Sequence, residues 1–179
     1  MIETQLGVIE VEIDTVRAPV TAANFLRYVD AGHYNGGRFH RTVRTQPDNQ
    51  PRSKIKIDVI QGGVNPKFQD AGFGPIPLER TSQTGLRHTD GAISMARTAP
   101  DSAVSDFFLC LGDQPELDFG GRRNPDGQGF AAFGRVRQGM EVVRRIHQSP
   151  AAPSGSTAAV AAGHQRLDPP VEIIRIRRK

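Results

Sequence analysis

The sequence predicts a mainly β protein, a closed eight-stranded antiparallel β-barrel capped by two α-helices. Eight short runs of alternating or continuous apolar residues are spread over 179 residues, and two further segments have helical periodicity. Nineteen Gly and 13 Pro supply the many turns that short strands need. Closure of the sheet removes exposed strand edges, and a chain of this length fits one domain, residues 1–179.

The first two strands are expected at residues 2–5 and 8–13. In the second run Ile and Val alternate with Glu, which is the pattern of a half-buried strand. Leu6 and Gly7 lie between the two runs and predict a tight turn.

Two helices interrupt the strands. Thr21 is expected to be the N-cap of the first, which runs to about Val29 and ends at Gly32. The second is expected at residues 138–147, where three apolar side chains share one face and a proline follows.

The remaining segments are six strands and three loops. The strands are expected at residues 39–43, 56–61, 92–97, 107–111, 131–136 and 171–177. The loops are expected at residues 45–53, 119–129 and 149–163. The last loop has the composition of a flexible connection, beyond which the final strand can return to pair with the N-terminal strands.

Composition excludes several classes of protein. The 23 Lys and Arg against 19 Asp and Glu give a net charge of +4, and the arginines near the C-terminus alternate with isoleucine, as on the outer face of a strand. We therefore expect no nucleic-acid partner. No apolar stretch is long enough to cross a membrane, and Cys110, the single cysteine, is expected to be a small buried residue. Because no signal-peptide features follow Met1, we expect a cytoplasmic protein, or a periplasmic one if an export signal precedes this chain.

Several short motifs do not support the chemistry they suggest. The triplet Asp118-Phe119-Gly120 matches a kinase metal-binding motif, but the other kinase motifs are missing. The five histidines lack metal-ligand spacing, and no Ser/His/Asp order can be defended from spacing. Hydrolysis is poorly supported, and we expect neither a metal nor a cofactor.

What remains is a set of segments with two arginines, one amide and several apolar side chains. They are residues 39–41, 59–63, 92–97 and 106–111. Such a site can bind and polarise a substrate but has no nucleophile with which to bond to it.

These segments occur in the order and approximate spacing of the cyclophilins, which the chain resembles over nearly its whole length. The matching motifs are Phe39-His40-Arg41, Gln61-Gly62-Gly63, Ser94-Met95-Ala96, Phe107-Phe108 and Phe130-Ala131-Ala132-Phe133-Gly134. The resemblance implies a peptidyl-prolyl cis-trans isomerase that needs no cofactor. Its partners would be proline-containing peptides and unfolded chains, and we expect a monomer.

The resemblance also implies roles for individual residues. Arg41 matches the catalytic arginine, and Gln61 matches the glutamine that bonds the substrate backbone and holds Arg41. The substrate-binding residues would be Phe39, Val59, Ala96, Arg97, Phe108, Leu117 and Phe130. Ala96 and Arg97 would contribute main-chain atoms, so the side chain of Arg97 is expected to be free to differ.

The chain departs from the family in its pocket wall. Asp58 and Val59 stand where the best-known cyclophilins have Phe and Met, and Asp58 either weakens the wall or faces away toward a basic residue. The family's pocket tryptophan is missing, with Glu116 or Phe119 nearest its place, so we expect weak cyclosporin binding.

Two other functions stay open at this point. One is a proline-binding chaperone or interaction module with little turnover, suggested by Asp58 and the missing tryptophan. The other is a hollow barrel for a small ligand, as in the lipocalins, although the apolar residues on inward positions are numerous enough to fill the interior.

Overall fold

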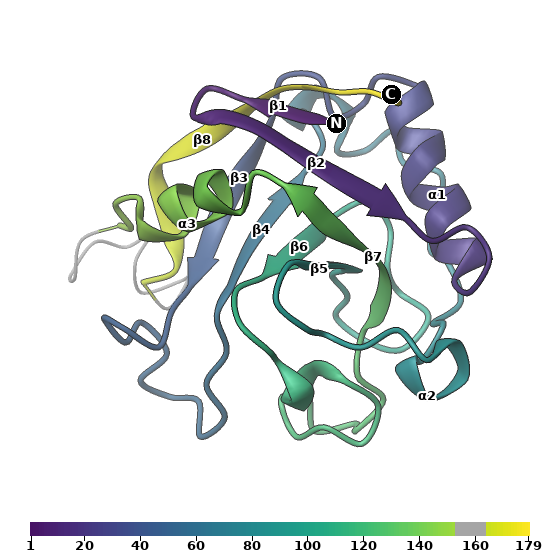
Figure 1. The fold of residues 1–179 in the computed structure, drawn as a ribbon, viewed down its shortest axis with the longest axis vertical. Coiled ribbons are helices and arrows are strands. Elements are labelled where there is room, and N and C mark those ends of the chain that lie inside the picture. Colours follow the sequence, from purple (N-terminus) through teal and green to yellow (C-terminus); the bar gives the residue numbers. More distant parts are fainter. Residues whose placement is uncertain (153–163) are drawn as a thin grey trace.

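The structure is a computed structural model that describes residues 1–152 and 164–179. Most of the expected loop at residues 149–163 lies outside the described residues. Eight antiparallel strands form a closed barrel in the order β1-β2-β7-β5-β6-β4-β3-β8 (Figure 1). Their bounds are β1 Ile2–Thr4, β2 Gly7–Ile13, β3 Gly37–Val43, β4 Val59–Gly63, β5 Ala92–Met95, β6 Phe107–Cys110, β7 Ala131–Gln138 and β8 Arg166–Ile176.

Each expected strand overlaps an observed one, with the largest shifts in β4 and β8. β4 begins at Val59 rather than at residue 56 and continues to Gly63. β8 begins at Arg166, five residues before the expected start at Val171, because it pairs with β3 as well as with β1. β8 is therefore the strand that closes the barrel.

The two expected helices are α1, Pro19–Asp30, and α3, Met140–Gln148. A short helix, α2 Thr81–Thr84, and two 3₁₀ turns, Pro66–Phe68 and Pro115–Leu117, were not expected. They carry too few residues to show helical periodicity.

The expected N-cap of α1 at Thr21 is wrong. The N-cap is Ala18, three residues earlier, and the helix begins at Pro19. The Thr21 hydroxyl donates to a carboxylate oxygen of Glu79 at 2.6 Å. Glu79 also accepts the backbone N–H groups of Val20 and Thr21. An acid 58 residues further along the chain thus satisfies the first N–H groups, which a local sequence pattern cannot reveal.

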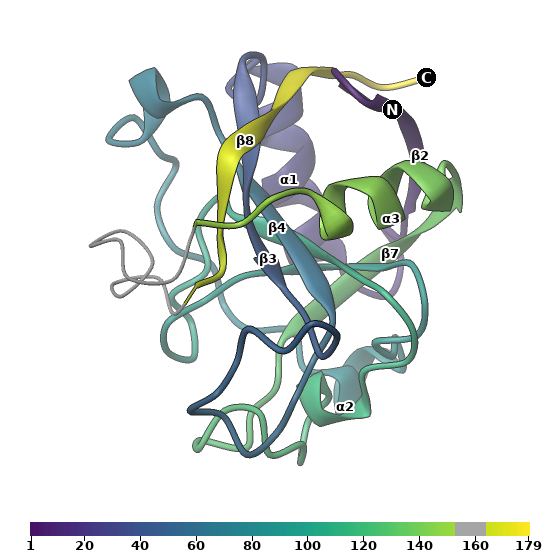
Figure 2. The same cartoon turned by 90° about the vertical axis from the view of Figure 1, so that its left-hand side faces the viewer.

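The barrel interior is filled by side chains. Phe25 of α1 packs against Phe107 and Phe133 with ring centroids 5.5 and 5.3 Å apart. The buried face of α3, with Val143 and Ile146, belongs to the same core, and α1 and α3 lie on different sides of the barrel (Figures 1 and 2). A hollow ligand-binding barrel does not fit this packing.

Two further features bear on the surface of the molecule. The amino group of Met1 donates to the carbonyl oxygen of Arg177 at 2.7 Å, so the chain ends lie together, as Figure 1 shows. Within the described residues, no helix has the length and apolar character to span a bilayer.

Candidate active site

A cavity of about 600 Å³ brings together most of the residues singled out from the sequence. It lies among β3, β4, β6, the end of β5 and the loop before β7. Eight of the predicted residues line it: Arg41, Val59, Gln61, Ala96, Arg97, Phe108, Leu117 and Phe130. One side of this cavity is polar and the other is apolar.

Arg41 is held on the polar side by two glutamine side chains. Its Nη1 donates to Oε1 of Gln61 at 2.9 Å, and its Nε and Nη2 donate to Oε1 of Gln165 at 2.9 and 2.5 Å. The amide nitrogen of Gln165 donates to the carbonyl of Asn49 at 3.2 Å, which fixes the direction of its amide. Three of the guanidinium N–H groups are thus used, which leaves one on each terminal nitrogen for a substrate.

A β-bulge brings Arg41 into the cavity. The register of β3 against both β4 and β8 shifts between Phe39 and Arg41, so His40 and Arg41 are both half-buried in succession. Burial, with the nearby charge of Arg123, lowers the pKa of Arg41, but an arginine stays charged at any physiological pH.

Gln61 is oriented by Asp106. The Gln61 amide nitrogen donates to Oδ2 of Asp106 at 3.0 Å, so its carbonyl oxygen faces Arg41. Gly63 makes this contact possible, since a Cβ at that position would collide with the Asp106 carboxylate. His40 Nε2 lies 3.5 Å from the same carboxylate, and burial lowers the pKa of His40 despite the opposing effect of Asp106. Neither Asp106 nor Gln165 was identified from the sequence.

Five side chains form the apolar side of the cavity: Ile57, Val59, Phe108, Leu117 and Phe130. The rings of Phe108 and Phe130 meet edge to face, with centroids 5.4 Å apart and an interplanar angle of 88°. Ile57 was missed in the sequence, although alternation of apolar residues at 55, 57 and 59 would have indicated it.

Asp58 does not lie in the pocket wall. Its carboxylate accepts the backbone N–H and the hydroxyl of Thr45 at 2.9 and 2.8 Å and lies 3.4 Å from His147 Nε2. Of the two possibilities for Asp58, the structure therefore has the one in which it faces away. Ile57 and Val59, its neighbours, supply the apolar surface instead.

Phe39 is the one predicted substrate-binding residue that the structure removes from the site. Its ring is fully buried in the barrel core, where it packs edge to face against Phe107 at 5.7 Å. It touches the inner face of β4 at Gly62 and cannot reach a ligand in the cavity. Alternation along β3 directs it inward.

The side chain of Arg97 is held in place by several partners. It is 1% exposed and forms a bidentate pair with Asp126 at 2.8 and 2.9 Å. Its Nε donates to the carbonyl of Gly129 at 2.7 Å, and its guanidinium lies 5.0 Å from the ring centre of Phe130. Arg97 therefore fixes the loop before β7 and one aromatic wall.

At the rim of the cavity, Arg123 joins the loop between β6 and β7, residues 111–130, to the loop between β3 and β4, residues 44–58. Its Nη1 donates to Gln50, at 2.9 Å, and to Ser53, at 2.6 Å, and also to the carbonyl of Ile55. These loops lie at the same end of the barrel in both views (Figures 1 and 2).

Ser94, His88 and Asp118 come together beneath the aromatic wall. His88 Nδ1 lies 2.8 Å from Asp118 Oδ1, and His88 Nε2 lies 2.9 Å from Ser94 Oγ. All three are buried, and the His88 ring stacks on Phe108 at 5.9 Å. The order resembles a hydrolytic triad, but a buried hydroxyl beneath an aromatic ring cannot be reached by a substrate, so these residues support Phe108.

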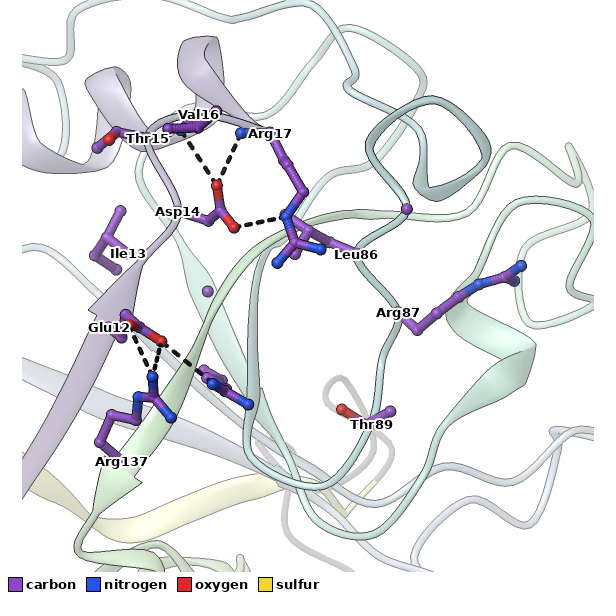
Figure 3. Close-up of a pocket in the computed structure, with 13 residues that line it drawn as sticks. Glu12, Ile13, Asp14, Thr15, Val16, Arg17, Leu86, Arg87, Thr89 and Arg137 are labelled. Atoms are coloured by element: carbon purple, nitrogen blue, oxygen red, sulfur yellow. Dashed lines mark hydrogen bonds and ion pairs between the residues drawn. The ribbon is translucent and has the colours of Figure 1, made fainter.

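Another cavity, of about 630 Å³, lies between the ends of β2 and β7 and the loop that precedes β5 (Figure 3). Each of its arginines already pairs with a carboxylate. Arg17 pairs with Asp14 at 2.7 Å, Arg135 and Arg137 pair with Glu12 at 3.3 and 2.7 Å, and Arg87 pairs with Asp118 at 3.4 Å. No cluster of three or more His, Cys, Asp or Glu side chains is placed to hold a metal within residues 1–152 and 164–179. The cavity around Arg41 is therefore the better candidate for a reaction.

Known proteins resemble this chain over most of its length. Residues 1–178 match the family model for cyclophilin type peptidyl-prolyl cis-trans isomerases. The chain is 38% identical to peptidyl-prolyl cis-trans isomerase A of Dickeya dadantii, over 83% of this chain and 70% of that protein. It is 34% identical to peptidyl-prolyl cis-trans isomerase cyp18 of Streptomyces antibioticus, over 98% and 93%.

A solved structure shows the same fold. The cyclophilin type isomerase of Cryptosporidium parvum, crystallised in the presence of the dipeptide Ala-Pro, superposes with a TM-score of 0.71. It covers 99% of this chain and 97% of its own at 21% identity, so this likeness concerns the fold alone.

Proposed function

The chain belongs to the cyclophilin-type peptidyl-prolyl cis-trans isomerases, and on that premise we propose that Arg41 and Gln61 carry out the isomerisation. The reaction is rotation about the C–N bond of an X-Pro peptide. Partial double-bond character gives this bond a barrier of roughly 18–20 kcal/mol. Anything that localises the nitrogen lone pair lowers that barrier.

The observation that carries this mechanism is the guanidinium of Arg41, fixed by two glutamine oxygens at the border of an apolar cavity. A donor directed at the prolyl nitrogen binds it more strongly as the bond twists and the lone pair localises. Such an interaction stabilises the transition state more than the ground state. Because both glutamines hold Arg41 before substrate arrives, little reorganisation is needed during the reaction.

The apolar side of the cavity suits a proline ring. Ile57, Phe108, Leu117 and Phe130 offer aliphatic and aromatic surface, and burial of a ring of this size contributes about 1–3 kcal/mol to binding. The Ala96 N–H, just beyond the end of β5, donates to the carbonyl of Asp106 at 2.9 Å, so an extended peptide would pair with the other main-chain groups of Ala96 and Arg97, as in strand addition. Proline-containing peptides and unfolded chains are therefore the proposed substrates.

Isomerisation of a short X-Pro peptide, followed by exchange NMR, tests the mechanism. We expect Arg41→Ala to lower kcat/KM by about 100- to 1000-fold, the typical loss for removal of one preorganised donor. Arg137→Gln, in the cavity of Figure 3, is the matched control and should behave like the wild type. Equal rates for wild type and Arg41→Ala would contradict the assignment.

Proline binding without turnover is the second candidate, and the structure weakens one of its two supports. Asp58 faces Thr45 and His147, so no carboxylate replaces the apolar wall. The second support, the absence of the family's pocket tryptophan, still holds, because neither Glu116 nor Phe119 lines the cavity. We therefore still expect weak cyclosporin binding. Binding of an X-Pro peptide without exchange between its isomers would favour this candidate.

A further inference from the structure

A further cavity, of about 560 Å³, adjoins the cavity around Arg41 in which we place the proline ring. We call it the second cavity, and it is distinct from the cavity of Figure 3. The two share Arg41, Gln69, Ser105 and Asp106, so they form one continuous groove with Arg41 between its two parts. Beyond this shared boundary, the second cavity is lined by residues of β3, of β8 and of the segment at the end of β4, and not by the apolar wall.

Three arginines gather in the second cavity: Arg38, Arg41 and Arg166. Arg166 is the register partner of Arg41 in the β3–β8 pairing, and like charges in directly opposed positions destabilise a sheet. Among the residues described as lining this cavity, Asp106 is the only acid, and it is already engaged by Gln61 and by His40. The positive charge is thus not balanced by the protein.

Arg38 and Arg166 differ from the arginines of the cavity in Figure 3. Each of those pairs with a carboxylate, whereas the side chains of Arg38 and Arg166 form neither an ion pair nor a hydrogen bond with any described residue. The register partner of Arg38, Glu172, does not come within ion-pair distance of it. Residues 153–163 contain no Asp or Glu and so offer no carboxylate.

The state of His40 is consistent with a positive groove. Burial lowers its pKa, and the charges of Arg41 and Arg38 lower it further, against the opposing effect of Asp106. His40 is then neutral at pH 7, and the groove holds three cations against one carboxylate.

We propose that this second cavity is a substrate subsite for the carboxylate of an Asp or Glu side chain in the same peptide whose proline occupies the neighbouring cavity. The inference rests on the proposed isomerase function and narrows its substrates. Guanidinium groups match a carboxylate through paired N–H donors. An extended peptide advances about 3.3 Å per residue, so the acid lies within a few residues of the proline.

Acetylated alanine-based peptides with one X-Pro bond test the subsite. Glu, Gln or Lys is placed in turn at each of the positions flanking the X-Pro pair, and kcat/KM is measured for every peptide. At one of these positions we expect Glu to exceed Gln by about three- to tenfold, and Lys to fall below Gln. The preference should shrink at about 0.5 M NaCl.

Variants locate the preference. Arg38→Gln and Arg166→Gln should each reduce the ratio of Glu to Gln peptides, and the double variant should bring it close to one. Arg137→Gln changes the same net charge in the other cavity and should leave the ratio unchanged. Thermal unfolding of each variant confirms that it is folded.

The outcomes separate the subsite from the isomerase. If the wild type turns over the Gln peptides but prefers Glu at no position, the subsite is refuted and the isomerase stands. The subsite is also refuted if Arg137→Gln reduces the preference for Glu as much as Arg38→Gln does. If no peptide is turned over, the proposed isomerase activity is refuted. Calorimetric Kd values for the Glu and Gln peptides then test the subsite: tighter binding of Glu peptides that Arg38→Gln and Arg166→Gln reduce would support it, and equal binding would refute it.

Discussion

Substitution of Gln165 tests whether the charge of Arg41, and not only its position, lowers the rotation barrier. The Gln165 carbonyl accepts two of the three hydrogen bonds that hold Arg41, at 2.9 and 2.5 Å. Gln165→Ala removes both. A hydrogen bond to a charged group contributes about 1.5–3 kcal/mol, but water replaces part of it around a half-buried guanidinium.

From this we expect Gln165→Ala to lose about 1–2 kcal/mol of transition-state stabilisation, or about five- to thirtyfold in kcat/KM. Gln165→Glu keeps an oxygen beside Arg41 and adds a negative charge. At about 4 Å and an effective dielectric constant of about 20, opposite charges attract by about 4 kcal/mol. That carboxylate offsets the field of Arg41 at the prolyl nitrogen, so Gln165→Glu should lose at least as much kcat as Gln165→Ala.

Exchange NMR of an X-Pro peptide gives kcat and KM for both variants, and urea unfolding shows that each is folded. KM should change less than kcat, because the apolar wall is intact. Wild-type kcat in Gln165→Glu together with a loss in Gln165→Ala would show that only the position of Arg41 matters. Wild-type rates in both would refute any role for Gln165.

Three further predictions concern the body of the protein. Phe39→Ala should lower the free energy of unfolding by about 3–5 kcal/mol, while the folded fraction keeps its KM for X-Pro peptides; a raised KM would return Phe39 to the site. Burial lowers the pKa of His147, so the unfolded chain binds a proton more readily, and stability should fall as pH drops through about 6.5. Urea unfolding of His147→Gln should show a smaller fall between about pH 7.5 and 5.5, and an identical fall would exclude this origin. Burial also raises the pKa of Cys110, so its thiol should react with a disulfide reagent only on unfolding, and rapid native reaction would contradict its burial.

The strands could be predicted because their cause is local. Apolar and polar residues alternate within 8–13 and 171–177 because one face of each strand is exposed to solvent and the other is buried. Both segments lie in strands of the structure. The start of α1 could not be predicted, since Glu79 rather than Thr21 satisfies its first N–H groups. The direction in which the Asp58 side chain points could not be predicted either, because its partners, Thr45 and His147, lie 13 and 89 residues away along the chain.

In the site, residues expected to touch the substrate were easier to find than those that hold them in place. Arg41 and Gln61 lie in motifs on strands, and the cavity brings them together. Gln165, 124 residues from Arg41, follows a segment of low complexity. His88 meets Asp118 across 30 residues. Contacts over such separations depend on the closed barrel, and no local pattern in the sequence marks them.

The place of β8 in the barrel has a consequence for the order in which this site can form during synthesis. β3, which carries Arg41, is complete early in the chain, but one of its two neighbours is β8. A nascent chain that lacks residues 164–176 leaves the edges of β1 and β3 open and Arg41 without Gln165. A ribosome-bound chain should therefore gain isomerase activity late and in one step, once β8 has emerged.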